Sequence, residues 1–151
     1  MFGADHTKAI IEISAGSRSK YEIDKETGLL TLERELTIPY PANYGFIPNT
    51  LSADGDALDV FVVSNYPIDP LTVLRYKLVG HIAMLDQGVE DDKLIAILPN
   101  YTGSVDISAI ALFLQTYKEG TEILSLSLND VGARETLTRA RLTFLESVGN
   151  G

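Results

Sequence analysis

The sequence predicts an α+β protein that is mainly β, a small closed β-barrel with two C-terminal helices packed outside it. Six short apolar or alternating runs, separated by Gly, Pro, Asn and Asp, occupy the first two thirds of the 151 residues. After Pro99 the apolar spacing changes to the helical period. No repeat or heptad pattern interrupts this order, so we expect one domain, residues 1–151.

The strand patterns are followed by turn signals that fix their order. The six runs are residues 9–13, 20–24, 29–34, 58–64, 73–84 and 93–98. Glu26, Thr27 and Gly28 predict a hairpin turn in which Gly28 adopts a positive φ. Residues 39–49 contain three prolines and predict a long irregular segment, a kind of loop that often serves function.

Two helices are expected after Pro99. Apolar spacing predicts the first over residues 107–117, with Ser104 or Asp106 as its N-cap and Gly120 just past its end. One further strand is expected over residues 122–128. The second helix is expected over about residues 130–148, with a stripe made of Leu137, Ala140, Arg141, Phe144, Leu145 and Val148.

Composition excludes several classes of protein. The net charge is -9, from 21 acidic and 12 basic residues, which argues against general affinity for nucleic acid phosphates and favours cations. Cysteine is absent, so thiolate chemistry, disulfides and Cys-based zinc sites are excluded. The N-terminus lacks a signal-peptide pattern, and no segment reaches a membrane-spanning length. We therefore expect a soluble, cytoplasmic protein.

Three carboxylates crowd the entrance of the strand at residues 58–64. Asp59 shares a strand face with Phe61 and Val63, where an unpaired carboxylate would be costly. Asp54 and Asp56 precede it, and Gly55 permits the tight backbone that would bring the three together. This crowding predicts a site for a hard metal cation.

A second acidic cluster, residues 86–92, separates two predicted strands and is followed by Lys93. It is compatible with a polar hairpin loop. It is also compatible with a metal site shared with the first cluster, because oxygen ligands suit Mg²⁺, Mn²⁺ or Ca²⁺. His81 lies in an apolar run and is interpreted as a satisfied core or interface side chain.

Several charged residues fall on strand faces that otherwise look apolar. Arg34 follows Leu30 and Leu32 in steps of two, so it is expected among core leucines and beside a buried anion. Further residues in unusual positions are Lys20, Glu22, Lys93 and Glu12. Each alone is compatible with a solvated face or a stem lying along the surface. Together with bound metals they predict a cavity that attracts a polyanion, so phosphate chemistry is expected.

These residues resemble the motifs of the soluble family I inorganic pyrophosphatases, over residues from about 9 to 118. The matching blocks are Lys20-Tyr21-Glu22, Arg34, Tyr40-Pro41-Ala42-Asn43-Tyr44-Gly45, residues 54–60, residues 86–93 and Tyr117-Lys118. The resemblance implies a five-stranded, oligonucleotide-binding-like (OB-like) closed barrel. It also implies hydrolysis of pyrophosphate to two orthophosphates with several Mg²⁺ ions per site, for which Mn²⁺ could substitute.

The resemblance further implies a role for each charged residue. Asp56 would accept a proton from the attacking water, and Glu12 would act through water in the outer shell. The implied metal ligands are Asp54, Asp59, Asp86, Asp91 and Glu22. The implied substrate ligands are Lys20, Arg34, Tyr44, Lys93, Tyr117 and Lys118. Besides Asp56, the implied catalytic residues are Arg34, Tyr44 and Lys118.

Other classes of function stay open on the sequence. One is a non-catalytic protein that binds divalent cations, another is a hydrolase of a different phosphoanhydride, and a third is a barrel that binds nucleic acid. The family resemblance also implies a homo-oligomer, with a hexamer favoured. Gln87 replaces an acidic residue common in the family, which would weaken outer-shell metal binding.

Overall fold

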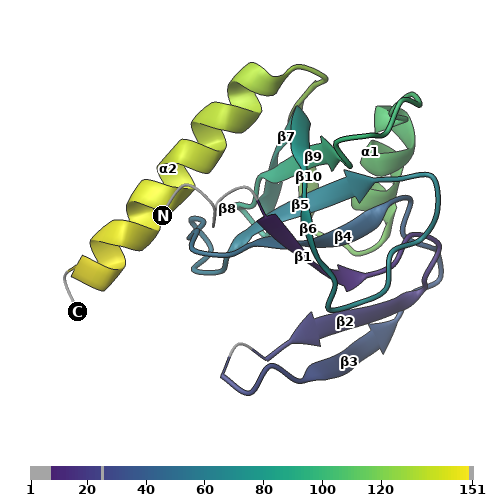
Figure 1. Ribbon diagram of the computed structural model, residues 1–151, viewed down its shortest axis with the longest axis horizontal. Coiled ribbons are helices and arrows are strands. Elements are labelled where there is room, and N and C mark those ends of the chain that lie inside the picture. Colours follow the sequence, from purple (N-terminus) through teal and green to yellow (C-terminus); the bar gives the residue numbers. More distant parts are fainter. Residues whose placement is uncertain (1–7, 25, 150–151) are drawn as a thin grey trace.

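The computed structural model describes residues 8–24 and 26–149, so the N-terminal segment discussed above, residues 1–7, lies outside the described residues. Figure 1 shows the arrangement of its strands and helices. The strands are β1 (Lys8–Ile13), β2 (Ser19–Ile23), β3 (Leu30–Glu35), β4 (Asn43–Ile47), β5 (Leu58–Val63), β6 (Val73–Arg75), β7 (Lys77–Asp86), β8 (Val89–Glu90), β9 (Lys93–Ile97) and β10 (Thr121–Ser127). The helices are α1 (Ile107–Thr116) and α2 (Asp130–Gly149).

The main sheet has the strand order β10-β7-β9-β5-β4-β1-β6, with β8 paired to β7 and with β2 and β3 in a separate hairpin. Only the β5–β9 pair is parallel among the described ladders. The mainly β content with two helices is therefore as predicted. In the described residues the ladder is open at β10 and β6, so closure into a five-stranded barrel stays a prediction.

The sheet has two apolar faces, each covered by one helix, and Figure 1 shows α1 and α2 on opposite sides of the strands. Leu58, Val60 and Val62 of β5 pack in the cluster that contains Ala133 and Ala140 of α2. Phe61, between them in sequence, packs in the cluster that contains residues of α1. The period of two predicted for β5 is confirmed, and it places Asp59 on the α1 side.

Strand β4 corrects the prediction of an irregular segment over residues 39–49. Its five residues lie in the middle of the sheet, between β1 and β5. Its central glycine, Gly45, is needed because a Cβ there would overlap the backbone carbonyl of Ile10 on β1. Glycine and the flanking prolines are local breaker signals, and they concealed a strand that is specified by this close backbone contact.

Strand β3 corrects the expectation that Arg34 lies among core leucines. Leu32 is 53% exposed, and only Leu36, after the strand, is buried. Figure 1 shows the β2–β3 hairpin extending away from the main sheet, so its leucines have no second layer to pack against. The predicted turn at its tip is confirmed, with Gly28 at φ 75°.

Two shorter strands were also missed. The predicted run over residues 73–84 is divided at Tyr76 into β6, which pairs with β1, and β7, which pairs with β9 and β10. Within the acidic segment 86–92, Val89 and Glu90 form β8 against β7. The polar hairpin interpretation of that segment is thus also correct in part.

Helix α1 agrees closely with its prediction. Asp106 is the N-cap, and its carboxylate accepts a hydrogen bond of 3.0 Å from the amide of Ala109. Its buried residues are Ile110, Ala111, Phe113 and Leu114.

Helix α2 has the predicted length, but its predicted stripe is wrong at the C-terminal end. Leu145 and Val148 are 58% and 59% exposed, while Ala133, Thr136 and Ala140 are buried. Thr136 contacts Nε2 of His81 at 3.2 Å, and the same nitrogen lies 3.0 Å from Asp92, so His81 is satisfied as expected. Neither described helix is long and apolar enough to cross a membrane.

Candidate active site

A polar cleft of about 180 Å³ opens on the α1 side of the sheet, beside the β2–β3 hairpin. Twelve of the thirteen site residues predicted from the sequence line it. They are Glu12, Lys20, Glu22, Tyr44, Asp54, Asp56, Asp59, Asp86, Asp91, Lys93, Tyr117 and Lys118. Residues from six separate parts of the chain therefore meet in one place.

A tight turn presents the first two aspartates to this cleft. The amide of Ser52 donates to the carbonyl of Asp56 at 2.7 Å, and the amide of Gly55 donates to the carbonyl of Ser52 at 3.0 Å. Gly55 has φ 88°, a left-handed conformation that favours glycine. Oδ1 of Asp54 accepts from the amide of Asp56 at 3.0 Å, so the two exposed carboxylates come from one ordered turn.

Lys93 is the most deeply buried charge in the cleft, with 2% of its surface exposed. Its ammonium nitrogen lies 2.5 Å from Asp59, 3.0 Å from Asp91 and 2.9 Å from the hydroxyl of Tyr44. The parallel pairing of β5 and β9 produces this contact, because it sets Lys93 directly beside Asp59.

The electrostatics of this group follow from its burial and its charges. Burial is the largest single effect on Lys93 and disfavours its ammonium form, but Asp59, Tyr44 and Asp91 together outweigh it, so the pKa of Lys93 is well above its ordinary value. Burial also raises the pKa of the Asp91 carboxyl, against the opposing effect of Lys93. The pKa of Tyr44 is raised chiefly by burial, so its hydroxyl stays protonated and can accept from Lys93 while donating elsewhere.

A second ion pair in the cleft joins Lys118 and Asp86. Nζ of Lys118 lies 2.5 Å from Oδ2 of Asp86 and sits over the ring of Tyr117, 5.4 Å from its centroid. Burial is the largest single effect on Lys118 and opposes its charged form, but the hydrogen bond to Asp86 and the interaction with Tyr117 together raise its pKa. Oδ1 of Asp86 is buried and has no hydrogen-bond partner among the described residues.

Aromatic rings form the wall of the cleft behind these charges. The Tyr117 ring stacks on Phe113 of α1, with centroids 5.0 Å apart and an interplanar angle of 12°. The Tyr44 ring packs against Phe61 at 4.8 Å. Both tyrosines thus have packing partners and also line the cleft, so their packing is compatible with the ligand role that the family resemblance implies.

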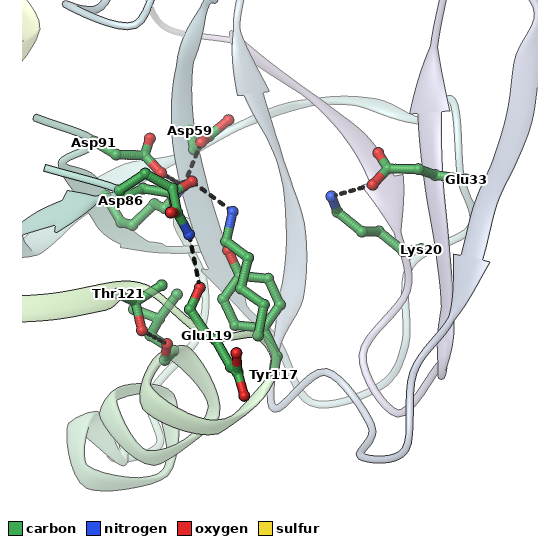
Figure 2. A network of polar contacts seen from close by, with 12 residues as sticks. Lys20, Glu33, Asp59, Asp86, Asp91, Tyr117, Glu119 and Thr121 are labelled. Carbon is green, nitrogen blue, oxygen red and sulfur yellow. Dashed lines mark hydrogen bonds and ion pairs between the residues drawn. The ribbon is translucent and has the colours of Figure 1, made fainter. Parts of the chain in front are cut away.

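The β2–β3 hairpin supplies the opposite wall. Lys20 pairs with Glu33 at 2.8 Å, as Figure 2 shows, and this hydrogen bond lowers the pKa of Glu33. Glu12, which is 8% exposed, accepts from the amide of Ile23 at 3.1 Å. Glu33 lines the cleft and was missed, because a bulge between its neighbours shifts the β2–β3 register. Its position beside Arg34 in a charged run was the signal that could have found it.

Arg34 is the one predicted site residue that does not line the cleft. It is exposed, and its Nη2 donates to the backbone carbonyl of Tyr117 at 3.2 Å. It therefore meets a carbonyl oxygen at the rim, and the buried anion expected for it is not its partner.

The chemistry of the cleft fits a divalent cation. Its predicted ligands are all carboxylates, the preferred donors of Mg²⁺, and Asp86 carries a buried oxygen without a partner. As the described side chains lie, no three acidic or histidine side chains converge on one point. In this arrangement the ammonium group of Lys93 lies between Asp59 and Asp91, and that of Lys118 is paired with Asp86.

The fold and the cleft together define a mainly β protein whose polar site combines carboxylates for cations with lysines and tyrosines for anions. Residues 9–123 match the family model described as inorganic pyrophosphatase. The chain belongs to the inorganic pyrophosphatase family, and its relatives place it with the soluble family I members.

Individual relatives give the extent of the similarity. Soluble inorganic pyrophosphatase 2 of Chlamydomonas reinhardtii is 51% identical over 106 residues, which are 67% of this chain and 55% of that protein. The inorganic pyrophosphatase of Halalkalibacterium halodurans is 42% identical and is covered over 84% of its length. The chain thus spans little more than half of the first relative and most of the second.

Solved structures support the same fold. The inorganic pyrophosphatase structure from Helicobacter pylori has a TM-score of 0.83 and 33% identity, with 91% of this chain and 92% of that chain covered. The structure from Thermus thermophilus has a TM-score of 0.83 and 30% identity, with 91% and 90% covered.

Proposed function

We propose that the protein hydrolyses pyrophosphate to two orthophosphates in this cleft, with Mg²⁺ as its cofactor. The observation that supports it most directly is the meeting of two sets of residues in one small cleft. One set is the aspartates of two acidic segments, residues 54–59 and 86–91, and the other is the lysines and tyrosines. Metal storage alone would need no cations around the carboxylates, and a cleft of about 180 Å³ suits a small polyanion.

In this proposal the protein's own residues hold and orient the substrate. Lys20, Lys93 and Lys118 neutralise phosphate oxygens, and the tyrosine hydroxyls donate hydrogen bonds to them. Arg34 acts from the rim, next to Tyr117. Asp56 lies at the exposed end of its turn, where its carboxylate accepts the proton of the attacking water.

The carboxylates proposed to hold Mg²⁺ are Asp54, Asp59, Asp86, Asp91 and Glu22, with Glu12 acting through water. Bound Mg²⁺, or Mn²⁺ in its place, supplies charge neutralisation and makes the water more acidic. Lys93 and Lys118 would exchange their carboxylate partners for phosphate when cations are present. The ion pairs described above keep the empty carboxylates neutralised until then.

Substitution of the proposed general base tests the mechanism. Asp56→Asn keeps the size and the turn but removes the proton acceptor, so turnover should fall by about 10²- to 10⁴-fold. Phosphate release at saturating Mg²⁺ measures it, and calorimetric titration should show that Mg²⁺ still binds. Asp69→Asn, at an exposed aspartate that does not line the cleft, is the matched control. Wild-type protein that releases no phosphate above background would contradict the proposed function.

The proposal extends to the domain organisation, the location and the oligomeric state of the protein. We propose that residues 1–151 form one pyrophosphatase domain with the closed five-stranded barrel, and that it acts in the cytoplasm. We also propose that it forms a homo-oligomer, with a hexamer favoured. Light scattering of the purified protein measures its mass in solution directly.

A further inference from the structure

Residues 117–120 form the turn that carries Tyr117 and Lys118, two proposed phosphate ligands. Gln87 contacts this turn from outside the cleft. Gln87 follows Asp86 at the end of β7 and is absent from the residues that line the cleft. Its backbone amide donates to the carbonyl of Gly120 at 2.8 Å, and its side-chain Nε2 donates to the carbonyl of Glu119 at 3.0 Å. Figure 2 shows the hydrogen bond to the carbonyl of Glu119, which lies two residues after Tyr117.

The backbone on both sides of this contact is specialised for it. Gln87 has φ 54°, a left-handed conformation that strains a residue other than glycine. Gly120 has φ 87°, and a Cβ at this position would overlap the side-chain nitrogen Nε2 of Gln87. The glutamine amide therefore fills the space that the glycine leaves open, and its two hydrogen bonds offset the strain.

The contact fixes residues that face the substrate. Tyr117 and Lys118 precede Glu119 in the same turn, and Lys118 reaches Asp86, the residue next to Gln87. Two neighbouring residues at the end of β7 therefore contact this turn. Asp86 binds the side chain of Lys118, and Gln87 binds the backbone carbonyls of Glu119 and Gly120. With substrate bound, Lys118 is expected to leave Asp86, and the Gln87 contact is then the part that persists.

We infer that Gln87 is a positioning residue, which sets Tyr117 and Lys118 for phosphate binding by fixing the 117–120 turn. This inference rests on the proposed function for the nature of the ligand. The amide is required because it donates to a carbonyl, which a carboxylate of the same length does not do. The structure thus gives Gln87 a partner other than the outer metal shell considered from the sequence.

The test compares Gln87→Met, which keeps the length and removes the donor, with Gln115→Met as a control. Gln115 is exposed on α1 and does not line the cleft, so the control makes the same substitution away from this contact. In Gln87→Met the KM for pyrophosphate should rise about fivefold with kcat within about twofold, the size expected for one lost hydrogen bond. The control should keep both constants.

Two further measurements do not depend on turnover. In Gln87→Met, orthophosphate should bind the Mg²⁺-loaded protein about fivefold more weakly, and amide hydrogen exchange over residues 118–120 should speed up by a similar factor. If the wild type releases no phosphate from pyrophosphate, the proposed function fails, while these two measurements still decide the positioning inference.

A third variant separates this inference from a role in the metal shell. Gln87→Glu should behave as Gln87→Met does, since it also lacks the donor. Unchanged phosphate affinity in Gln87→Met, or tighter Mg²⁺ binding with normal phosphate affinity in Gln87→Glu, would overturn the inference.

Discussion

The ammonium group of Lys93 lies between Asp59 and Asp91, two of the carboxylates that would hold a divalent cation in the proposed enzyme. It is almost fully buried, and its partners are Asp59 on β5 and Asp91 in the turn before β9. Removing one partner of such a group leaves charges uncompensated, which costs more than the pair itself contributes. Lys93 therefore has two functions in our proposal, neutralising the empty site and binding phosphate in the filled one.

Lys93→Met should destabilise the metal-free protein by about 3–5 kcal/mol, because two neighbouring carboxylates lose their shared cation. Mg²⁺ should then restore more stability in the variant than it adds to the wild type, since it replaces the missing charge. Urea unfolding with EDTA and with Mg²⁺ measures both values. Lys77→Met, at an exposed lysine on β7, is the control. Equal gains from Mg²⁺ in Lys93→Met and in the wild type would contradict this interpretation.

The charged residues of the cleft were largely predictable, but their pairing was not. A period of two placed Asp59 and Lys93 each on an otherwise apolar face of its own strand, and both lie in the cleft. Their contact depends on the parallel register of β5 and β9, which joins residues 34 apart in the sequence and which no local pattern contains. For the same reason Glu33, displaced by a bulge, was missed.

At the scale of elements, α1 carries the aromatic wall, and its start depends on one side chain. Asp106 caps the helix through the amide of Ala109. Asp106→Ala should reduce the free energy of unfolding by about 1 kcal/mol, because the amide loses its acceptor. Asp106→Asn keeps a capping oxygen and should be nearly neutral. Urea unfolding of the three proteins tests the cap, and equal loss in both variants would instead indicate a role for the charge.

Elements with strong local signals were predicted well, and those specified by their neighbours were not. Helix α1 has a cap, a stripe and a following glycine, and it was placed within one residue of its observed end. Strand β4 is specified by contact with β1 at Gly45, and its prolines and glycine indicated a loop instead. The leucines of β3 suggested a core strand, but no layer covers this hairpin, as Leu32 shows by its exposure.

At the scale of the whole molecule, the net charge of -9 and the acidic cleft predict that divalent cations stabilise the folded state. In the proposed site, cations would be held by Asp54, Asp59 and Asp91, which only the native fold brings together, so binding would add to the free energy of unfolding. At about 100 times the dissociation constant the gain is about 2.7 kcal/mol, which should raise the Tm of a chain of this size by roughly 5–10 °C.

Thermal unfolding in Mg²⁺ and in EDTA measures this shift, and two controls separate binding from charge screening. NaCl at the same ionic strength weakens the repulsion among surface carboxylates without occupying a site, so it should raise the Tm much less. Asp59→Asn removes a carboxylate proposed to hold the cation and should lose most of the Mg²⁺ effect, whereas Asp69→Asn should keep it. A full Mg²⁺ effect in Asp59→Asn would show that the stabilising cation binds outside the cleft, and the metal assignment for Asp59 would then be wrong.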